Sequence, residues 1–173
     1  MNNIKLGQTV RDVASGFKGL AVQRIDQLNG NVQWALQPKV GEDGVFKDAL
    51  QMDNHMLEVI DDGLADKVTA VTDTVDFVLG NEVKDLATGF VGIAIEKATY
   101  MNGCVSYWVV PKHDPKSIVK DSAPSGTWLS SKRLVYKGAG IAEKVRKPTA
   151  DPYNGRIPGG PPARVARPMV RGR

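Results

Sequence analysis

Apolar and polar residues alternate in short stretches through the first 143 residues of the chain. Residues 9–13 and 82–86 alternate in this way, and residues 19–25 and 92–98, rich in β-branched and aliphatic side chains, follow them. A period of two residues is typical of β-strands that bury one face. Because neither half carries the 3.6-residue period of a long helix, the pattern predicts an all-β fold.

An Asn-Gly pair follows each of the second stretches, at residues 29–30 and 102–103, and a further apolar stretch comes after it, at 32–36 and 105–110. Asn-Gly between two such stretches is a strong hairpin signal, because both central residues of a type I′ turn need positive φ. We therefore expect a type I′ hairpin at each pair. A proline, which cannot donate to a sheet ladder, ends each hairpin.

The whole pattern occurs twice. Residues 6–38 align without a gap with residues 79–111 at a constant offset of 73, and 13 of the 33 aligned positions are identical. Most of the shared residues set backbone shape, namely Gly7 and Gly80, Gly16 and Gly89, Gly19 and Gly92, the two Asn-Gly pairs, and Pro38 and Pro111. Repetition of this kind indicates two fused copies of one module. A module this small has a marginal core, so we expect the two copies to pack against each other.

An Asp-x-x-[Ser/Thr]-Gly-Phe-x-Gly element joins the first two expected strands of each copy, at residues 12–19 and 85–92. Its aspartate can accept hydrogen bonds from turn amides, in the manner of an Asx-turn, with the phenylalanine packed beneath. A shared two-carboxylate site is the alternative, but turn capping that repeats with the fold explains the aspartates better. The expected structural turn residues are Asp12, Gly16, Phe17, Gly30, Asp85, Gly89, Phe90 and Gly103.

Each copy closes with a fourth strand, at residues 50–60 in the first copy and 126–136 in the second, where the offset has grown to about 77. Short strands and glycine turns in modules of this size predict two tandem SH3-like small barrels with an extended C-terminal arm. The expected division is a first SH3-like module at 1–62, a connector at 63–76, a second SH3-like module at 77–143 and a basic arm rich in Pro, Gly and Arg at 144–173. Within the connector, the alternation of residues 68–75 predicts a further strand.

The net charge of +4 is unevenly distributed. Residues 144–173 hold eight basic residues and one acid, a charge of +7, which leaves residues 1–143 at −3. Six prolines and four glycines among the last 29 residues favour an extended, partly polyproline arm.

Three interpretations of the arm remain open: it binds a protein, it contacts nucleic-acid phosphates, or it is a disordered solubilising end. Single arginines interleaved with Pro, Gly and Val, in place of a Lys/Arg block, favour the protein-binding arm. The expected partner-binding residues are Arg156, Arg164, Val165, Arg167, Met169, Val170, Arg171 and Arg173.

Catalytic chemistry finds little support in the sequence. Neither His55 nor His113 belongs to a metal-ligand spacing, and nothing brings His113, Asp114 and Ser117 into nucleophile geometry. Cys104 is the single cysteine, which excludes an internal disulfide, and a partly packed structural role is favoured over a reactive thiol. We therefore expect no enzyme activity, no catalytic, metal or cofactor-binding residues and no cofactor.

Five aromatic residues could form a peptide-binding groove, although core packing explains most of them, since strand alternation puts one of each neighbouring pair inside. They are Trp34, Tyr100, Tyr107, Trp108 and Trp128. No run of 18 apolar residues and no signal-peptide pattern occurs, so we expect cytoplasmic synthesis and no membrane partner.

The run Leu-Gly-x-x-Val-[Lys/Arg]-Asp-x-Ala-[Thr/Ser]-Gly-Phe-x-Gly-[Ile/Leu]-Ala, followed by Asn-Gly-Cys and Val-x-Pro, resembles short proteins encoded in tailed-bacteriophage genomes. Those proteins mostly consist of a single module of unassigned role. The resemblance spans residues 5–60 and 77–137, and the second copy is the closer match. The first copy departs from it at Asn31, where the cysteine is missing, and at Gln51, where the tryptophan is missing.

The resemblance implies a phage virion structural protein, and we expect a capsid decoration (cement) protein that binds the major capsid lattice through its barrels and arm. Its partners would be the major capsid protein or other virion proteins, with homo-oligomers on the particle and localisation in the virion after assembly in the host cytoplasm. The alternatives are a nucleic-acid-binding SH3-like module, a neck or tail attachment protein, and a host-directed regulator that uses an aromatic groove. The resemblance brings no active site with it.

Overall fold

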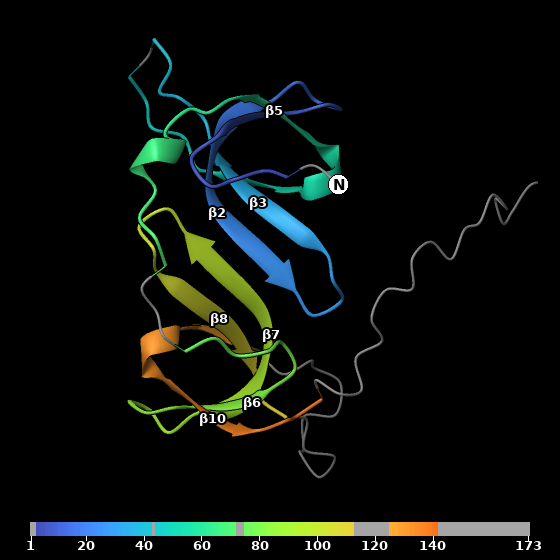
Figure 1. Cartoon of the computed structure of the whole chain (residues 1–173), viewed down its shortest axis with the longest axis vertical. Helices are drawn as coiled ribbons and strands as arrows, with labels where there is room; N and C mark the ends of the chain where they lie inside the picture. Colours follow the sequence, from blue (N-terminus) through green and yellow to red (C-terminus); the bar gives the residue numbers. More distant parts are fainter. Residues whose placement is uncertain (1–2, 43, 72–74, 113–124, 142–173) are drawn as a thin grey trace, which may run out of the picture.

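The computed structural model describes residues 3–42, 44–71, 75–112 and 125–141, and its regular structure is almost entirely β, which confirms the all-β prediction (Figure 1). The first repeat holds β1 (Thr9–Asp12), β2 (Lys18–Gln27), β3 (Val32–Gln37), β4 (Leu50–Asp53) and β5 (Leu57–Asp61). The second repeat holds β6 (Glu82–Asp85), β7 (Val91–Tyr100), β8 (Val105–Val110), β9 (Thr127–Ser130) and β10 (Leu134–Gly138).

The expected single fourth strand of each repeat is wrong, because a short 3-10 turn divides it into two strands. This turn is η1 (Asn54–Met56) in the first repeat and η3 (Ser131–Arg133) in the second. The turn redirects the chain, so that β4 pairs with β3 while β5 returns along β1. Each repeat therefore has the antiparallel order β5-β1-β2-β3-β4, or β10-β6-β7-β8-β9.

Each repeat encloses its own apolar core, and the same positions of the repeat build both cores. In the first repeat the buried cluster is Ile4, Val10, Ala21, Trp34, Leu36 and Leu57. In the second it is Phe77, Val83, Ala94, Val105, Tyr107, Val109, Leu129 and Leu134. The alternation that predicted the strands thus selects the side chains that are buried.

The Asn-Gly hairpins form, but their turns are not type I′. Gly30 N–H donates to Gln27 O at 2.9 Å, so the turn is centred on Leu28 and Asn29 and the glycine follows it with φ 85°. The second hairpin repeats this bond, from Gly103 N–H to Tyr100 O at 3.0 Å. A three-residue loop of this kind places its positive-φ residue last, which explains why glycine stands at the end of the pair.

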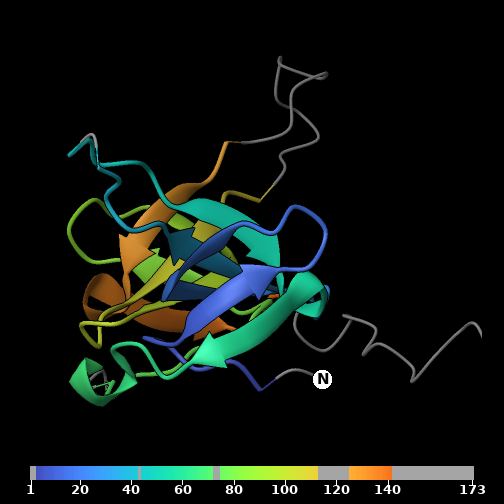
Figure 2. The same ribbon diagram turned by 90° about the horizontal axis from the view of Figure 1, so that it is seen from above.

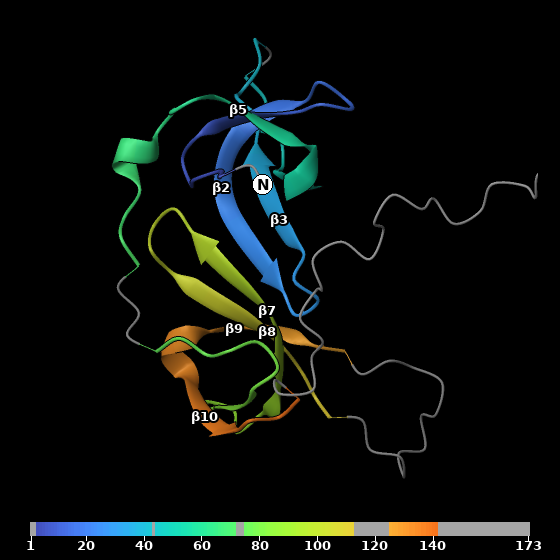
Figure 3. The ribbon, with the colours of Figure 1, turned by 45° about the vertical axis from the view of Figure 1, so that its right-hand side comes forward.

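The two repeats join edge to edge through β2 and β7, which lie side by side and antiparallel in Figures 1 and 3. The short β1, with Gly7 and Gln8 before it, covers only the first part of β2, as far as Ala21, and the rest of that edge pairs with β7 of the other repeat. An unpaired edge is open to association, and here each repeat covers the edge of the other. Viewed along the long axis, the first repeat lies in front of the second (Figure 2).

The sheet that results has ten strands and is open, because β4, β5, β9 and β10 each pair with a single strand in the part of the chain that the structure describes. The strand ladders therefore do not close, and the two closed barrels that we expected are not confirmed. In the connector, η2 (Ala65–Lys67) is the regular element. The strand expected at residues 68–75 is absent from the described residues of that stretch, where Thr69 N–H instead donates to Met101 O at 2.8 Å.

Candidate functional site

Six neighbouring strands, in the order β4-β3-β2-β7-β8-β9, form one continuous surface that crosses both repeats. One side of this surface carries the two cores. We call the opposite side the outer face. Residues paired directly across antiparallel strands point to the same side. The register accordingly assigns to the outer face Gln51, Asp53, Gln33, Ala35, Gln23, Ile25, Gln27, Glu96, Ala98, Tyr100, Ser106, Trp108, Trp128 and Ser130.

A chain of side-chain hydrogen bonds runs across the outer face from β4 to β7. Asp53 Oδ1 accepts from Asn31 Nδ2 at 3.1 Å and from Gln33 Nε2 at 3.0 Å. Gln27 Nε2 donates to Gln33 Oε1 at 3.4 Å and, across the boundary between the repeats, to Glu96 Oε1 at 3.3 Å. The amide donors of Asn31 and then Gln33 hold the pKa of Asp53 below its ordinary value. These contacts restrict the conformations of the polar side chains.

Two tryptophans continue this row into the second repeat. Trp108 pairs with Glu96 on one side and with Trp128 on the other, and the indole rings meet edge to face with centroids 5.5 Å apart. Trp128 keeps 37% of its surface exposed. A Cβ atom at Gly126 would lie 2.5 Å from Trp108 Nε1, so the glycine lets the backbone pack against this indole.

Tyr100 occupies another part of the outer face, paired with Gln23 across the boundary. Burial, with the nearby Cys104 as a smaller cause, raises the pKa of the Tyr100 hydroxyl, which also forms a hydrogen bond with Ser106. The Tyr100 hydroxyl therefore stays protonated at physiological pH, and Tyr100 lies four residues along β7 from Glu96, away from the polar row.

The charge of the outer face is negative within the described residues, since Asp53 and Glu96 lie on it and its register positions hold no lysine or arginine. The nearest cations on these strands point to the other side. Arg24 bonds Asp26 at 2.7 Å and lies over the Trp34 ring, while Lys97 bonds the exposed Asp76 at 2.8 Å.

A hollow of about 480 Å³ lies on that core side of the boundary. Its lining is Asn3, Ile4, Lys5, Leu6, Arg24, Asp26, Trp34, Lys97 and Thr99. Arg24 and Lys97, two cations in this lining, are already paired with the carboxylates of Asp26 and Asp76.

The turn aspartates lie in separate repeats, and each serves its own turn. Asp12 Oδ2 accepts from Ser15 N at 2.8 Å and from Ser15 Oγ at 2.6 Å, and these bonds lower the pKa of Asp12. Asp85 Oδ2 accepts the equivalent bonds from Thr88, at 3.1 and 2.6 Å. A shared two-carboxylate centre does not form.

Asp85 has a further partner that Asp12 lacks. Arg133 donates from Nε to Oδ1 at 3.0 Å and from Nη2 to Oδ2 at 2.6 Å. This bidentate contact, followed by the Thr88 hydroxyl, lowers the pKa of the fully buried Asp85 to about 2. At the offset of 77, the first repeat has Met56 at the position of Arg133.

The other residues singled out in the sequence are dispersed. The turn glycines Gly16, Gly30, Gly89 and Gly103 all have positive φ, and Phe17 and Phe90 pack against the edges of the two cores. Trp34 and Tyr107 are core residues of different repeats, so the five aromatics do not share one groove. Cys104 is exposed, so the expectation that it is packed is wrong.

His55 is exposed on η1, and His113 lies outside the described residues. The predicted arm residues also lie outside them, namely Arg156, Arg164, Val165, Arg167, Met169, Val170, Arg171 and Arg173. The described part of the chain contains no group of metal-ligating side chains and no helix long and apolar enough to span a membrane.

The polar row of the outer face escaped the sequence analysis, because Asn31, Gln33 and Asp53 look like ordinary solvent-facing positions of amphipathic strands. A usable signal exists: amide and carboxylate side chains at alternating positions of adjacent strands will meet if the strands pair in register. The contact from Gln27 to Glu96 needs the pairing of the two repeats, which the sequence does not disclose.

Comparisons with protein families, with curated proteins and with solved structures found no match for this chain. Function is therefore argued from its geometry.

Proposed function

We propose that this chain is a virion structural protein of a tailed phage, a decoration protein that bridges neighbouring subunits of the capsid lattice. The observation that supports the proposal is that equivalent strands, each with exposed apolar side chains, lie at opposite ends of the molecule. Strands β5 and β10 occupy equivalent places in the repeats and lie at opposite ends of the long axis (Figure 1). A protein built in this way suits bridging better than it suits catalysis.

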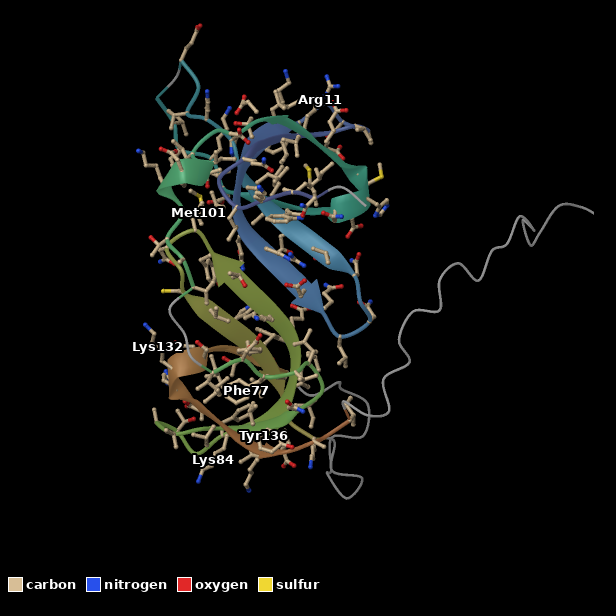
Figure 4. All side chains as sticks on the ribbon, in the orientation of Figure 1. Arg11, Phe77, Lys84, Met101, Lys132 and Tyr136 are labelled. Carbon is tan, nitrogen blue, oxygen red and sulfur yellow. The ribbon has the colours of Figure 1, made fainter. Side chains whose placement is uncertain are left out.

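Both ends expose apolar side chains. We define the first end surface as the edge of β5 with Val59 and Ile60, and the second as the edge of β10 with Val135 and Tyr136; all four side chains are substantially exposed. Val59 and Tyr136 occupy equivalent positions at the offset of 77, and each pairs with a core valine of β1 or β6. Figure 4 shows Arg11 at one end, and its equivalent Lys84 beside Tyr136 at the other. Exposed apolar groups beside unpaired strand edges are typical of protein-binding surfaces.

The link between the ends favours bridging. The β2–β7 ladder, extended by Leu28 N–H to Ile95 O at 2.8 Å and Met101 N–H to Val22 O at 3.2 Å, holds the repeats in one sheet. Once one end is bound, a rigid link keeps the other at high effective concentration near an adjacent lattice site. Two individually weak contacts then give stable attachment.

The finer fold assignment belongs to the same proposal. We assign each repeat to the SH3-like class, supported by the strand order β5-β1-β2-β3-β4 and by the 3-10 turn before the last strand. The proposal keeps the arm as a partner-binding segment, on its composition alone.

The first test is mass spectrometry of purified particles of the encoding phage, in which the chain should be found at a copy number comparable to that of a capsid component. Its absence from particles would reject the proposal. The second test adds purified protein to particles that lack it. Ile60→Glu and Tyr136→Glu should each weaken attachment by placing a charge in an apolar contact. Trp128→Ala, on the outer face, is the matched control and should attach normally.

The charge of the arm favours nucleic-acid binding as the second candidate. It predicts binding of the full chain to duplex DNA that weakens steeply with salt and disappears when residues 145–173 are removed. Attachment to particles that survives high salt favours the bridging function instead.

A further inference from the structure

We propose that the outer face binds a neutral, hydroxyl-rich glycan chain, with the exposed ring of Trp128 stacked on a sugar and the row from Glu96 to Asp53 bonding its hydroxyls. This binding site goes beyond attachment to the capsid, because it lies on the outer face and not on the end surfaces. It begins at β9 of the second repeat, crosses the boundary between the repeats and ends at Asp53 on β4 of the first repeat.

The comparison of the two repeats shows that the same strand ladder forms in the first repeat without a tryptophan pair. At the register positions of Trp108 and Trp128, the first repeat has Ala35 and Gln51, which pair in the same ladder. A module with the same strands and the same core positions therefore forms without either indole. A large apolar ring left 37% exposed, at a position where the first repeat has Gln51, is available for a ligand.

The row beside the indoles has the hydrogen-bonding character that sugars require. Amide side chains donate and accept at once, and an ionised carboxylate offers about four acceptor sites. Glu96 Oε1 accepts one bond from Gln27, and Asp53 Oδ1 accepts bonds from Asn31 and Gln33, so both carboxylates retain acceptor capacity. Sugar hydroxyls donate and accept in the same way, and side chains already held in place lose little entropy on binding.

The dimensions agree with a short oligosaccharide. Trp128, Trp108, Glu96 and Gln27 lie on four adjacent strands, in directly paired register. With strands about 4.8 Å apart, this row is about 14 Å long, and Gln33 and Asp53 extend it further. A ligand that follows the row crosses the strands and touches both repeats.

The negative charge of the outer face favours a neutral glycan over nucleic acids and other polyanions. The outer-face positions in the described residues carry the carboxylates of Asp53 and Glu96 and no cation, which disfavours nucleic acids and other polyanions. A peptide strand would add to the edge of the sheet, whereas these side chains lie on its face. A neutral polyol is not repelled by the two carboxylates, and it does not need a free strand edge to pair with.

The test is a titration of the full chain with neutral hexasaccharides of glucose, mannose and N-acetylglucosamine, followed by tryptophan fluorescence and calorimetry. We expect saturable binding of at least one of the three. Trp128→Ala should weaken it about tenfold or more, since aromatic stacking supplies a large share of such contacts. Tyr136→Ala removes a more exposed aromatic residue of the second repeat, which lies outside the outer face, and should change the affinity less than about twofold.

A second variant guards against misfolding. Glu96→Gln keeps the shape of the side chain and should weaken binding severalfold while leaving the thermal unfolding midpoint nearly unchanged. Absence of saturable binding to all three sugars at millimolar concentration overturns the proposal, as does binding that Trp128→Ala and Glu96→Gln both leave intact. Trp128-dependent binding of a single-stranded DNA or a peptide library, without sugar binding, would assign the face to that other ligand. Attachment of the same variants to particles is measured in a separate experiment. The glycan-binding proposal and the capsid-attachment proposal can therefore be rejected independently.

Discussion

Ile25 and Ala98 face each other at the middle of the β2–β7 ladder, and each occupies the same place in its own repeat. Two residues away on either side, Gln23 pairs with Tyr100 and Gln27 pairs with Glu96. Glu96 is the equivalent of Gln23 and Tyr100 is the equivalent of Gln27, so the ladder has a local two-fold relationship centred on the Ile25–Ala98 pair. Contact between equivalent surfaces is the isologous arrangement of symmetric dimers, here formed within one chain. Duplication thus gave each repeat a partner for its own open edge.

This central pair should contribute strongly to stability. Ile25 is 1% exposed and lies outside both core clusters, so its burial reports on the boundary between the repeats. Ile25→Ala should lower the free energy of unfolding by about 2 to 4 kcal/mol, through lost burial and the cavity left behind. Urea denaturation followed by circular dichroism measures this change. The control Val78→Ala, at a side chain 66% exposed, should stay within about 0.5 kcal/mol, and an equal loss in both variants would contradict the assignment.

The sequence predicted features that depend on local patterns and missed features that depend on partner choice. Alternation and the repeated glycines are local, so the strands and the turn at Asp12 could be found. The division of the fourth strand at Asn54–Met56 was missed, because the turn contains neither glycine nor proline and apolar residues stand on both sides of it. The pairing of Ile25 with Ala98 requires knowledge of which edge stays uncovered, and that depends on how short β1 is relative to β2.

The ion pair between Arg133 and the buried Asp85 should make the stability of the second repeat depend on pH. The pKa of Asp85 is about 2 in the folded protein against an ordinary 3.8, so the carboxylate stabilises the fold above its ordinary pKa and loses this effect as pH falls toward about 2. Asp85→Asn should therefore lower the thermal midpoint at pH 7, and the gap to the unchanged protein should narrow below about pH 4. A difference in thermal midpoint that does not change with pH would show that the ionised Asp85 carboxylate does not stabilise the fold.

Arg133 is the main cause of that lowered pKa, and its removal tests the attribution. Arg133→Met places in the second repeat the residue that the first repeat has at this position. The pKa of Asp85 should rise toward its ordinary value, because the Thr88 bonds alone remain. NMR titration of the Asp85 side-chain carbon measures the change. Arg133→Lys keeps a charge without the bidentate fork and should give an intermediate pKa.

The reciprocal change should strengthen the first repeat. Asp12 is nearly buried and accepts bonds from Ser15, but the equivalent of Arg133 is Met56. Met56→Arg should supply the missing fork to Asp12 and raise the thermal midpoint by a few degrees. Met56→Lys is the control and should gain less, because an ammonium group offers no planar pair of donors. A lower midpoint for Met56→Arg than for Met56→Lys would show that the first turn has no room for the guanidinium.

Two turn glycines of the second repeat separate backbone strain from steric conflict. Gly89 has φ 77° and open space where a Cβ would lie, so Gly89→Ala should cost only the left-handed conformation, about 1 to 2 kcal/mol. Gly103 has nearly the same φ, 79°, but its Cβ would lie 2.6 Å from the Ala70 carbonyl oxygen of the connector. Gly103→Ala must therefore also displace the connector from the β7–β8 hairpin, and should destabilise the protein more than Gly89→Ala in the same urea titration.

Faster amide exchange at Thr69, whose N–H bonds Met101 O, should accompany the larger loss in Gly103→Ala and be absent in Gly89→Ala. Equal losses in the two variants would place the connector away from this hairpin.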